Sequence, residues 1–319
     1  MNKNFSYYLS KFLKEYLVVE RNVSKETKRS YTKNFQMLIE YLVNTKNIKL
    51  KDITFEKITR DIILDYLNYL EGKGNSIRTR NQRLACIKSF YKYCLYYEIQ
   101  NIDNINKVLT INYKKCAKPI QDYLTEEEAS LILSRVDTST KIGKRDLLIL
   151  SLLYDTAARA SEIINLKIED INLEAKSIIL TGKGNKRRIV PIMEPTRDLL
   201  IRYLKDNDNK EYLFENKCKK PYNWCFIRDV ANKYTKGINK KVTPHIFRRS
   251  RAIHLLDKGV NIIYIQELLG HSDIITTQEY IRAITKTKFE AIEKVTPKLN
   301  AELPDWNDDK ELLNQLLSL

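Results

Sequence analysis

The chain has 319 residues and a formal net charge of +16, from 56 lysines and arginines against 40 aspartates and glutamates. This length suffices for two domains with separate hydrophobic cores, and such a charge says more about the partners of a protein than about its fold. No apolar stretch approaches the roughly 20 residues of a membrane span and no signal peptide is evident, so we expect a cytoplasmic, nucleoid-associated protein rather than a spanning or secreted one.

The first hundred residues have apolar side chains at helical spacing. Ser24 is placed to cap the second of the predicted helices, whose buried face carries Tyr31, Phe35, Leu38, Ile39 and Leu42. The four predicted helices span residues 5–18, 24–43, 61–71 and 76–97. Four helices in so short a stretch predict a compact bundle, which we assign to residues 1–112.

The fourth predicted helix is strongly basic at its start. Its predicted apolar stripe consists of Ile77, Leu84, Ile87 and Phe90. Arg78, Arg80 and Arg83 would lie on the other face, where they contact either DNA phosphates or only solvent. Basic residues beside aromatic ones in this helix, and the basic run at residues 183–188, favour a nucleic-acid partner over a soluble protein with dispersed lysines.

A polar segment separates this bundle from the rest of the chain. Residues 104–121 are basic, contain Pro119 and show no clear periodicity, so we expect a linker that ends near Asp122 and assign it to residues 113–122. Residues 123–319 then form a second domain. It begins with a capping box, Thr125 and Glu128, ahead of a helix over 129–136.

The second domain mixes helices with a small sheet. Residues 145–156 are apolar almost all round and predict a core helix, while 177–181 and 188–192 predict a hairpin around the turn 182–186. Residues 166–168 are a candidate third strand. Helices return after Pro195, with Gly259 and Gly270 as helix stops and Asn261 as a cap between them. The fold class is therefore mostly α with a small β-sheet: an N-terminal helical bundle and a mixed α/β domain.

Several polar residues of this second domain suit phosphodiester chemistry, in which negative charge grows on the phosphoryl oxygens. Arg159 follows an apolar helix directly, and Glu162 stands one turn later, where it either orients Arg159 or merely forms a structural salt bridge. Lys183 lies between two glycines in the hairpin turn, where it either protonates a leaving oxygen or belongs to an ordinary basic turn.

The last group of candidates comes from the C-terminal third. His245 and Arg248 are three residues apart at a helix start and point to one face, His271 follows a glycine stop, and Tyr280 comes nine residues later. A histidine can transfer protons near neutral pH, and a tyrosine can attack phosphorus. His254 stands among apolar residues, and we assign it to packing or a helix hydrogen bond.

The cysteines do not indicate a metal site. There are five, an odd number, with no CxxC spacing, and only three histidines could assist them. We therefore expect idle thiols in a reducing compartment, no metal and no cofactor.

Taken together, these segments resemble the tyrosine recombinases, the phage-integrase and Xer-like group. The motifs are Leu153–Glu162, Gly182–Lys186, His245–Arg248, and Leu268–Asp273 followed by Tyr280, with matching spacing throughout. The N-terminal bundle is similar to the core-binding domain of this family, most clearly over residues 76–93, so the resemblance covers nearly the whole chain.

The resemblance implies a residue-by-residue mechanism. Arg159 and Arg248 would clamp the scissile phosphate, and His271 would donate a hydrogen bond to it. Lys183 would protonate the 5′ leaving oxygen, and His245 would assist proton transfer at Tyr280, the nucleophile. The product is a 3′-phosphotyrosyl DNA, and neither ATP nor metal is needed because the phosphotyrosine retains the bond energy.

The resemblance also implies the partners. The substrate would be double-stranded DNA with an inverted-repeat-type crossover site, bound by a homotetramer or together with other recombinases. The C-terminal helix expected over residues 308–319, with Leu312, Leu313, Leu316 and Leu317 on one face, would dock on a neighbouring protomer or pack on its own domain. Lys186 and Arg187 beside the hairpin turn are further candidates for DNA contacts.

Two departures from the family pattern stand out. Ala157-Ala158 replaces the usual Gly-Leu before the first arginine, and Arg249-Ser250-Arg251 replaces a histidine-containing run. The second change adds positive charge, so we expect Arg249 and Arg251 to contact DNA.

Our leading functional hypothesis is an integrase or transposase of a mobile element. The alternatives are an Xer-like recombinase that resolves chromosome or plasmid dimers, a type IB topoisomerase, a DNA-binding regulator without catalysis, and an RNA-binding protein. The presence of all six catalytic residue types argues against the regulator, and the lack of an RNP-type stacking motif argues against RNA.

Overall fold

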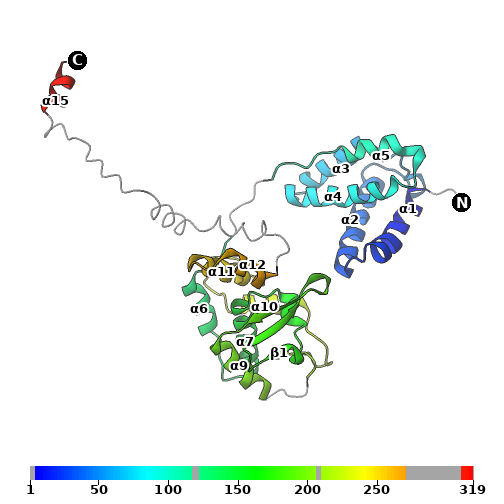
Figure 1. Cartoon of the computed structure of the whole chain (residues 1–319). Coiled ribbons are helices and arrows are strands. Elements are labelled where there is room, and N and C mark those ends of the chain that lie inside the picture. The colour runs from blue at the N-terminus through cyan, green and yellow to red at the C-terminus, as the bar shows by residue number, and fades with distance from the viewer. Residues whose placement is uncertain (1–3, 117–121, 206–209, 271–309, 319) are drawn as a thin grey trace. The chain divides into compact units, whose positions relative to one another are not determined.

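The computed structural model describes residues 4–116, 122–205, 210–270 and 310–318 (Figure 1). The chain divides into two compact units, Met1–Pro119 and Ile120–Leu319. Each unit has a hydrophobic core of its own. The predicted fold class is confirmed, because helices dominate both units and the described strands form one small antiparallel sheet.

The N-terminal unit is helical throughout. Side-chain caps fix three of its helix starts, because Ser24, Thr59 and Ser76 each accept a hydrogen bond from the backbone N–H three residues later. The helices are α1 (Phe5–Lys11), the π-helical η1 (Phe12–Glu20), α2 (Lys25–Asn44), η2 (Leu50–Asp52), α3 (Arg60–Gly72), α4 (Ile77–Cys94), η3 (Ile99–Asn101) and α5 (Ile102–Leu109).

Aromatic rings fill the centre of this unit. The ring centroid of Phe90 lies 5.2 Å from that of Phe5, 5.4 Å from Phe12 and 5.3 Å from Phe35, and each pair is close to edge-to-face. This geometry is the favoured one for aromatic pairs and adds to the free energy of simple burial. The rings come from α1, η1, α2 and α4, so they hold these four helices together.

Three expectations about this unit are wrong. Helix α4 ends at Cys94 rather than near Tyr97, and Ile77, 38% exposed, does not belong to its buried stripe. The segment expected to be a linker from residue 104 onward instead contains α5. Ile105 and Val108 of α5 are fully buried in the core, Ile111 is nearly so and Leu109 packs against it, so these apolar residues order a segment that looks polar in sequence.

The second unit is built around α7 (Lys141–Asp155), which the apolar pattern predicted to be a core helix. Leu148, Ile149, Leu150, Leu152 and Leu153 are all fully buried. Before it lies α6 (Glu126–Ser134), and the capping box predicted for Thr125 and Glu128 is present. After it, a short turn leads into α8 (Ala160–Ile164).

A three-stranded antiparallel sheet follows, in the order β1-β2-β3. It comprises β1 (Ile171–Asn172), β2 (Ser177–Thr181) and β3 (Arg187–Pro191), after the 3-10 turn η4 (Ile168–Asp170). The expected hairpin is confirmed, and Ser177 pairs with Pro191 and Thr181 with Arg187. Its turn, η5 (Lys183–Asn185), includes Gly184 at φ 73°, a conformation that favours glycine.

The third strand is not where the sequence placed it. Of residues 166–168, only Lys167 pairs, in an isolated bridge with Tyr212, and the third strand is β1. The reason is that Leu166 is drawn into the core while the chain turns through η4 before it pairs with β2.

Helices complete the second unit: α9 (Glu194–Lys205), α10 (Trp224–Lys233), α11 (Pro244–Asp257), α12 (Ile262–Leu269) and, near the end of the chain, α15 (Lys310–Leu317). The predicted stops are confirmed, since Gly259 and Gly270 both adopt positive φ and Gly270 is the C-cap of α12. Asn261 caps the start of α12. Within the described ranges no helix combines the length and the apolar character of a bilayer span.

Candidate active site

Arg159 is positioned by the tight turn that joins α7 to α8. The preceding residues, Thr156, Ala157 and Ala158, are fully buried, and the backbone of Ala157 is left-handed, with φ 49°. This turn aims the chain so that Arg159 becomes the N-cap of α8 at the edge of the core, with its side chain 31% exposed. Arg159 is therefore held at its base and accessible at its tip, as a phosphate-binding group must be.

Glu162 fixes the orientation of Arg159 from within the core. Its Oε2 accepts from the backbone N–H of Arg159 at 2.8 Å, and its Oε1 accepts from Nη1 of Arg159, also at 2.8 Å. The carboxylate is 1% exposed. The expected ion pair is thus present, and it both caps α8 and orients the guanidinium, so the structural and orienting interpretations hold together.

A second arginine, Arg188 on β3, shares the same carboxylate. Its Nη1 donates to Oε1 of Glu162 and its Nη2 donates to Oε2, both at 2.8 Å. Arg188 was not among the residues predicted from the sequence, although its neighbour Arg187 was. The alternation of the strand could have revealed it, because Arg188 lies on the same face as the buried Val190, where an arginine needs an acidic partner.

These contacts determine the charge state of Glu162. Burial by itself would raise the pKa of this carboxyl group. The hydrogen bonds and positive charges of Arg188, followed by those of Arg159, outweigh burial and lower the pKa to about 2. Glu162 is therefore an anion at any physiological pH, and with both arginines it leaves a net positive charge at the site.

Arg248, on α11, connects the turn before Arg159 to the end of α12. Its Nη1 donates to the carbonyl oxygen of Ala157 at 2.7 Å and its Nη2 to that of Leu269 at 2.5 Å. The side chain is buried, with 3% of the residue exposed. These two bonds fix the guanidinium between the turn before Arg159 and the end of α12.

The hairpin turn that carries Lys183 begins beside the same cluster. A Cβ atom built on Gly182 would lie 3.1 Å from Oε1 of Glu162 and 3.7 Å from Nη1 of Arg159. Glycine is therefore needed here for close approach, and it brings the backbone immediately before Lys183 against the Arg159–Glu162 pair. Gly182 also donates to the carbonyl of Lys186 at 2.8 Å, which closes the turn.

His245 stands in the first turn of α11, after Pro244 at the helix start. His245 is exposed, but partial desolvation by the protein around it lowers the pKa of its imidazole, and the nearby positive charges of Arg248, Arg159 and Arg249 lower it further. His245 is thus neutral at pH 7 and suited to accept a proton. The predicted residues Arg159, Glu162, His245 and Arg248 are brought together with Gly182, whereas His271 and Tyr280 lie outside the described residues.

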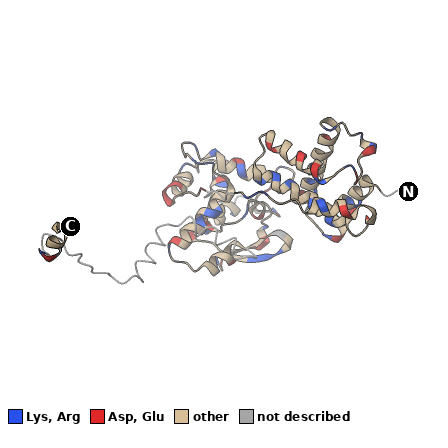
Figure 2. Cartoon of the chain, turned by 90° about the horizontal axis from the view of Figure 1, so that it is seen from above, with Lys and Arg blue, Asp and Glu red and all other residues tan. Residues whose placement is uncertain are grey.

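The proposed DNA contacts divide by exposure. Arg78, Lys186 and Arg187 are exposed, and Arg187 is paired with Asp170 at 2.6 Å. Arg83 and Arg249 are half-buried, and Nη1 of Arg249 donates to the carbonyl of Asp122 at 3.0 Å. Figure 2 shows that Lys and Arg are spread over both units.

One residue expected to contact DNA is buried instead. Arg80 is 2% exposed, and its Nε lies 3.1 Å from Oε1 of Glu71 on α3. The expectation that it lies on a DNA-facing surface is wrong, because an acidic partner on another helix draws it inward. Arg251 is half-buried: its side chain is 20% exposed, lies over the ring of Tyr154, 5.3 Å from its centroid, and is 3.5 Å from Asp155, and its contact with DNA stays a prediction.

His254 is a structural residue, as predicted. Its Nδ1 lies 2.8 Å from the hydroxyl of Tyr154, and its Nε2 lies 2.8 Å from the carbonyl oxygen of Leu124. These contacts join α11 to α7 and to the segment ahead of α6. His254 therefore stabilises the unit and does not belong to the site.

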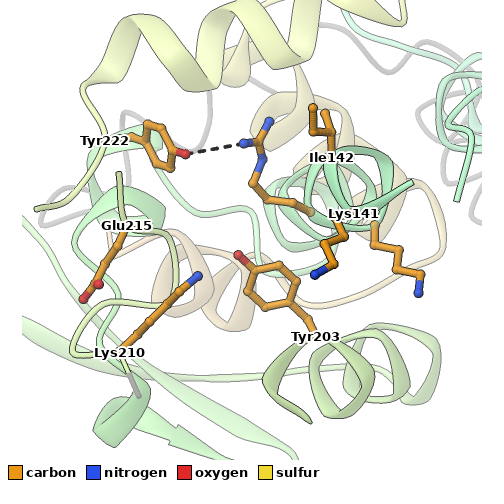
Figure 3. A pocket seen from close by; sticks show the side chains of 8 residues that line it. Lys141, Ile142, Tyr203, Lys210, Glu215 and Tyr222 are labelled. Carbon is orange, nitrogen blue, oxygen red and sulfur yellow. Dashed lines mark hydrogen bonds between the residues drawn. The ribbon is translucent and has the colours of Figure 1, made fainter. Parts of the chain in front are cut away.

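A further basic region lies at the other end of α7. A hollow of about 220 Å³ is lined by Lys141, Arg145, Tyr203, Lys210 and Tyr222, among others, and Figure 3 shows it from close by. Arg145 bonds to the buried Asp146, 2.7 Å away, and its guanidinium lies 4.7 Å from the ring centroid of Phe226. Since α7 has 15 residues, about 20 Å of helix separates this hollow from Arg159. No cluster of three or more potential metal ligands occurs in the part of the chain that the structure describes.

Comparison with known families gives two matches along the chain. Residues 122–286 match the phage integrase family, and residues 10–96 match the N-terminal SAM-like domain of phage integrases. The first match covers the whole site described above and continues through His271 and Tyr280.

Curated relatives are similar over most of their length. The tyrosine recombinase XerD of Listeria monocytogenes serovar 1/2a is 30% identical over 291 residues, which is 88% of this chain and 95% of the relative. The tyrosine recombinase XerA of Pyrococcus horikoshii is 39% identical over 236 residues, 72% of this chain and 78% of the relative.

Solved structures share the fold at lower identity. The site-specific recombinase XerH, bound to a palindromic difH substrate in a post-cleavage complex, has a TM-score of 0.71 at 22% identity and covers 90% of this chain and 83% of its own. The Tn1549 transposon integrase in complex with transposon right-end DNA has a TM-score of 0.69 at 18% identity, with coverage of 90% and 99%.

Proposed function

Since this chain belongs to the phage integrase family and is a tyrosine recombinase, we propose that it cleaves and rejoins DNA at specific sites through a 3′-phosphotyrosyl intermediate formed on Tyr280. The observation that supports this most directly is the shared environment of Arg159, Glu162, Arg248 and the turn before Lys183. It supplies an accessible guanidinium and a fixed surplus of positive charge at one place.

In the proposed cleavage step, the hydroxyl oxygen of Tyr280 attacks phosphorus. The new P–O bond to tyrosine forms as the bond from phosphorus to the 5′ oxygen breaks. The proton of the tyrosine passes to His245, and Lys183 gives a proton to the departing 5′ oxygen. A 5′ hydroxyl of a second strand reverses these steps, so no ATP and no metal are consumed.

The phosphoryl oxygens gain negative charge in this step. Arg159 offers them an exposed guanidinium whose other side is held by Glu162, so little reorganisation is needed as charge develops. Arg248 and His271 would complete the clamp, and the two carbonyl bonds of Arg248 hold its guanidinium in place. The lowered pKa of His245 keeps its imidazole neutral and ready to accept the proton of Tyr280.

We also propose that residues 1–112 form a DNA-clamping domain that contacts DNA through exposed residues such as Arg78 of α4. The substrate would be duplex DNA with inverted-repeat arms, held by a homotetramer on two paired sites. Two features support this assembly. Leu313, Leu316 and Leu317 of α15 are exposed. A hollow of about 310 Å³ is lined by Ile189, Pro191, Leu255, Val260, Tyr264 and Leu268. The apolar side chains of α15 on one copy suit the hollow on the next.

The biological role that we favour is integration or transposition of a mobile element, and the similarity in fold to the Tn1549 transposon integrase agrees with it. The alternative is an Xer-like recombinase that resolves chromosome or plasmid dimers, and the names of the curated relatives favour that alternative. Both roles use the same chemistry and differ in the DNA that is cut.

A covalent-trapping assay tests the chemistry and the role together. The protein is incubated with fragmented genomic DNA and with nicked suicide substrates built from the flanks of its own coding region, then denatured. We expect an adduct that Tyr280→Phe abolishes while DNA binding persists. Adducts at the ends of a mobile element support the favoured role, whereas adducts at one fixed chromosomal or plasmid site support the alternative. Tight binding without an adduct from either DNA source would contradict the proposed chemistry.

A further inference from the structure

Arg188 contacts both halves of the candidate site. Its two Nη groups donate to the two oxygens of Glu162, each at 2.8 Å, and its Nε donates to the carbonyl oxygen of Leu268 at 2.9 Å. Glu162 in turn holds Arg159. One side chain thus joins the carboxylate that orients the phosphate-binding arginine to the last turn of α12.

The end of α12 is closely fitted to this arginine. A Cβ atom built on Gly270 would lie 3.0 Å from Cδ and 3.1 Å from Nη1 of Arg188, and Gly270 itself has a left-handed φ of 60°. A side chain at this position would displace the guanidinium. The residue that follows Gly270 in the chain is His271, so the contacts of Arg188 and Gly270 set the point from which the chain enters that histidine.

The geometry of these bonds requires an arginine. The guanidinium uses its planar fork for the carboxylate and its remaining edge for the carbonyl, and the side chain is only 11% exposed. A lysine ammonium carries the same charge on a single atom and cannot span both oxygens of Glu162 and the Leu268 carbonyl in the same plane. Arg188→Lys therefore removes the positioning while it retains the charge.

We propose that Arg188 is a positioning residue for phosphoryl transfer, which sets Arg159, through Glu162, and the segment entering His271 in a common geometry. The proposal rests on the function proposed above. Arg188 itself need not touch DNA, because its donors are directed at Glu162 and Leu268. It acts through residues that touch the phosphate, and its effect is exerted on the rate of the chemical step.

The test is single-turnover cleavage of a nicked suicide substrate at saturating protein, read as a rate constant and an amplitude. For Arg188→Lys we expect a fall of roughly 100-fold in the rate constant, the scale set by a misplacement of about 1 Å. The amplitude and the Kd for DNA should stay within about threefold of wild type, since the fold and the exposed cations are retained. A merely structural role would lower the amplitude, through loss of folded protein, and leave the rate constant of the remaining enzyme unchanged.

Arg197 on α9 provides a matched control. It too donates its Nε to a backbone carbonyl, that of Leu173 at 2.8 Å, and pairs with a glutamate, Glu194, at 3.3 Å. Arg197→Lys removes the same kind of contacts outside the site, so its rate constant should equal that of wild type. An equal loss in both variants would overturn the proposal.

A double-mutant cycle tests the route through Glu162. If Arg188 acts on Arg159 through this carboxylate, Arg188→Lys combined with Glu162→Gln should be about as slow as the slower single variant. Two losses that multiply would overturn that route. Wild-type cleavage that depends on Tyr280 is measured on the same gels to separate the two proposals. If this cleavage is present, the proposed function stands whatever the Arg188 variants do.

Discussion

Arg248 donates a hydrogen bond of 2.7 Å to the carbonyl oxygen of Ala157, a residue whose backbone is left-handed with φ 49°. Glycine adopts this conformation without strain, whereas for alanine it costs about 1–2 kcal/mol of conformational energy. The family commonly has glycine where this chain has Ala157. The strained turn carries a carbonyl that a buried arginine binds, so the backbone conformation at Ala157 and the position of Arg248 depend on each other.

Substitutions at Ala157 should therefore separate the effect of backbone strain from the effect of side-chain packing on the free energy of unfolding. Ala157→Gly relieves the left-handed strain but removes a fully buried methyl group worth about 1 kcal/mol, so the net change in the free energy of unfolding should be within about 1 kcal/mol. Ala157→Val adds a β-branched side chain to a left-handed, buried position beside Ile265 and Leu269, and should lower the unfolding temperature by many degrees. Thermal unfolding followed by circular dichroism checks both, and equal melting of the two variants would contradict the argument.

The second prediction concerns pH and Glu162. The folded pKa is about 2 against an ordinary value of 4.5, so this group stabilises the fold above pH 4.5, and the stabilisation is lost as the pH falls from 4.5 towards 2. At pH 7 the contribution is on the order of 3 kcal/mol, from 1.4 kcal/mol for each unit of pKa. Glu162→Gln should be less stable than wild type by about this amount at pH 7.

Urea unfolding of wild type and Glu162→Gln at several pH values measures that difference. It should shrink steadily below pH 4.5. A difference that stays constant down to pH 3 would show that the carboxylate charge is not what stabilises the site.

The third prediction concerns His254. Burial lowers the pKa of this imidazole, and the hydrogen bond to Leu124 opposes that shift only in part. The folded state therefore favours the neutral ring, and stability should fall as the pH drops below the ordinary value of 6.5, where the unfolded chain takes up a proton more readily. His254→Gln removes the titration, so the difference in unfolding midpoint between wild type and variant should change between pH 8 and pH 5.5. A difference that does not vary with pH would refute this explanation.

Arg78 and Arg80 form a fourth test, because they lie two residues apart on α4 but differ in environment. Arg78 is exposed, so Arg78→Ala should weaken DNA binding and reduce the slope of log K against log salt by about 0.9, the value for one phosphate contact. Arg80 is buried against Glu71, so Arg80→Ala should instead lower the unfolding temperature by roughly 5 °C or more. Fluorescence anisotropy at several salt concentrations and thermal melts distinguish the two. A loss of salt slope in Arg80→Ala at unchanged stability would reverse the assignment.

Local signals in the sequence were reliable guides to the fold. Ser24, Ser76 and the capping box at Thr125 mark helix starts because each interacts with a backbone group within one turn. The helix ends at Gly259 and Gly270 are equally local, because each depends on the positive φ of a single glycine. Such features need no knowledge of the rest of the chain.

The prediction that was wrong for Arg80 concerns a partner distant in sequence, because Glu71 buries this arginine from another helix. Arg188 was missed because its carboxylate partner lies 26 residues away. The order of several motifs pointed to one chemistry and led to Arg159, Glu162, His245 and Arg248, and their roles, like those of Lys183, His271 and Tyr280, remain predictions.

The presence of two separate cores has a consequence for how such proteins diversify. The aromatic cluster around Phe90 in the N-terminal unit does not depend on the leucines of α7, and those leucines do not depend on it. Core substitutions in one unit therefore remove no contact from the core of the other. The first hundred residues can therefore change in evolution while the residues of the second unit and its core are retained.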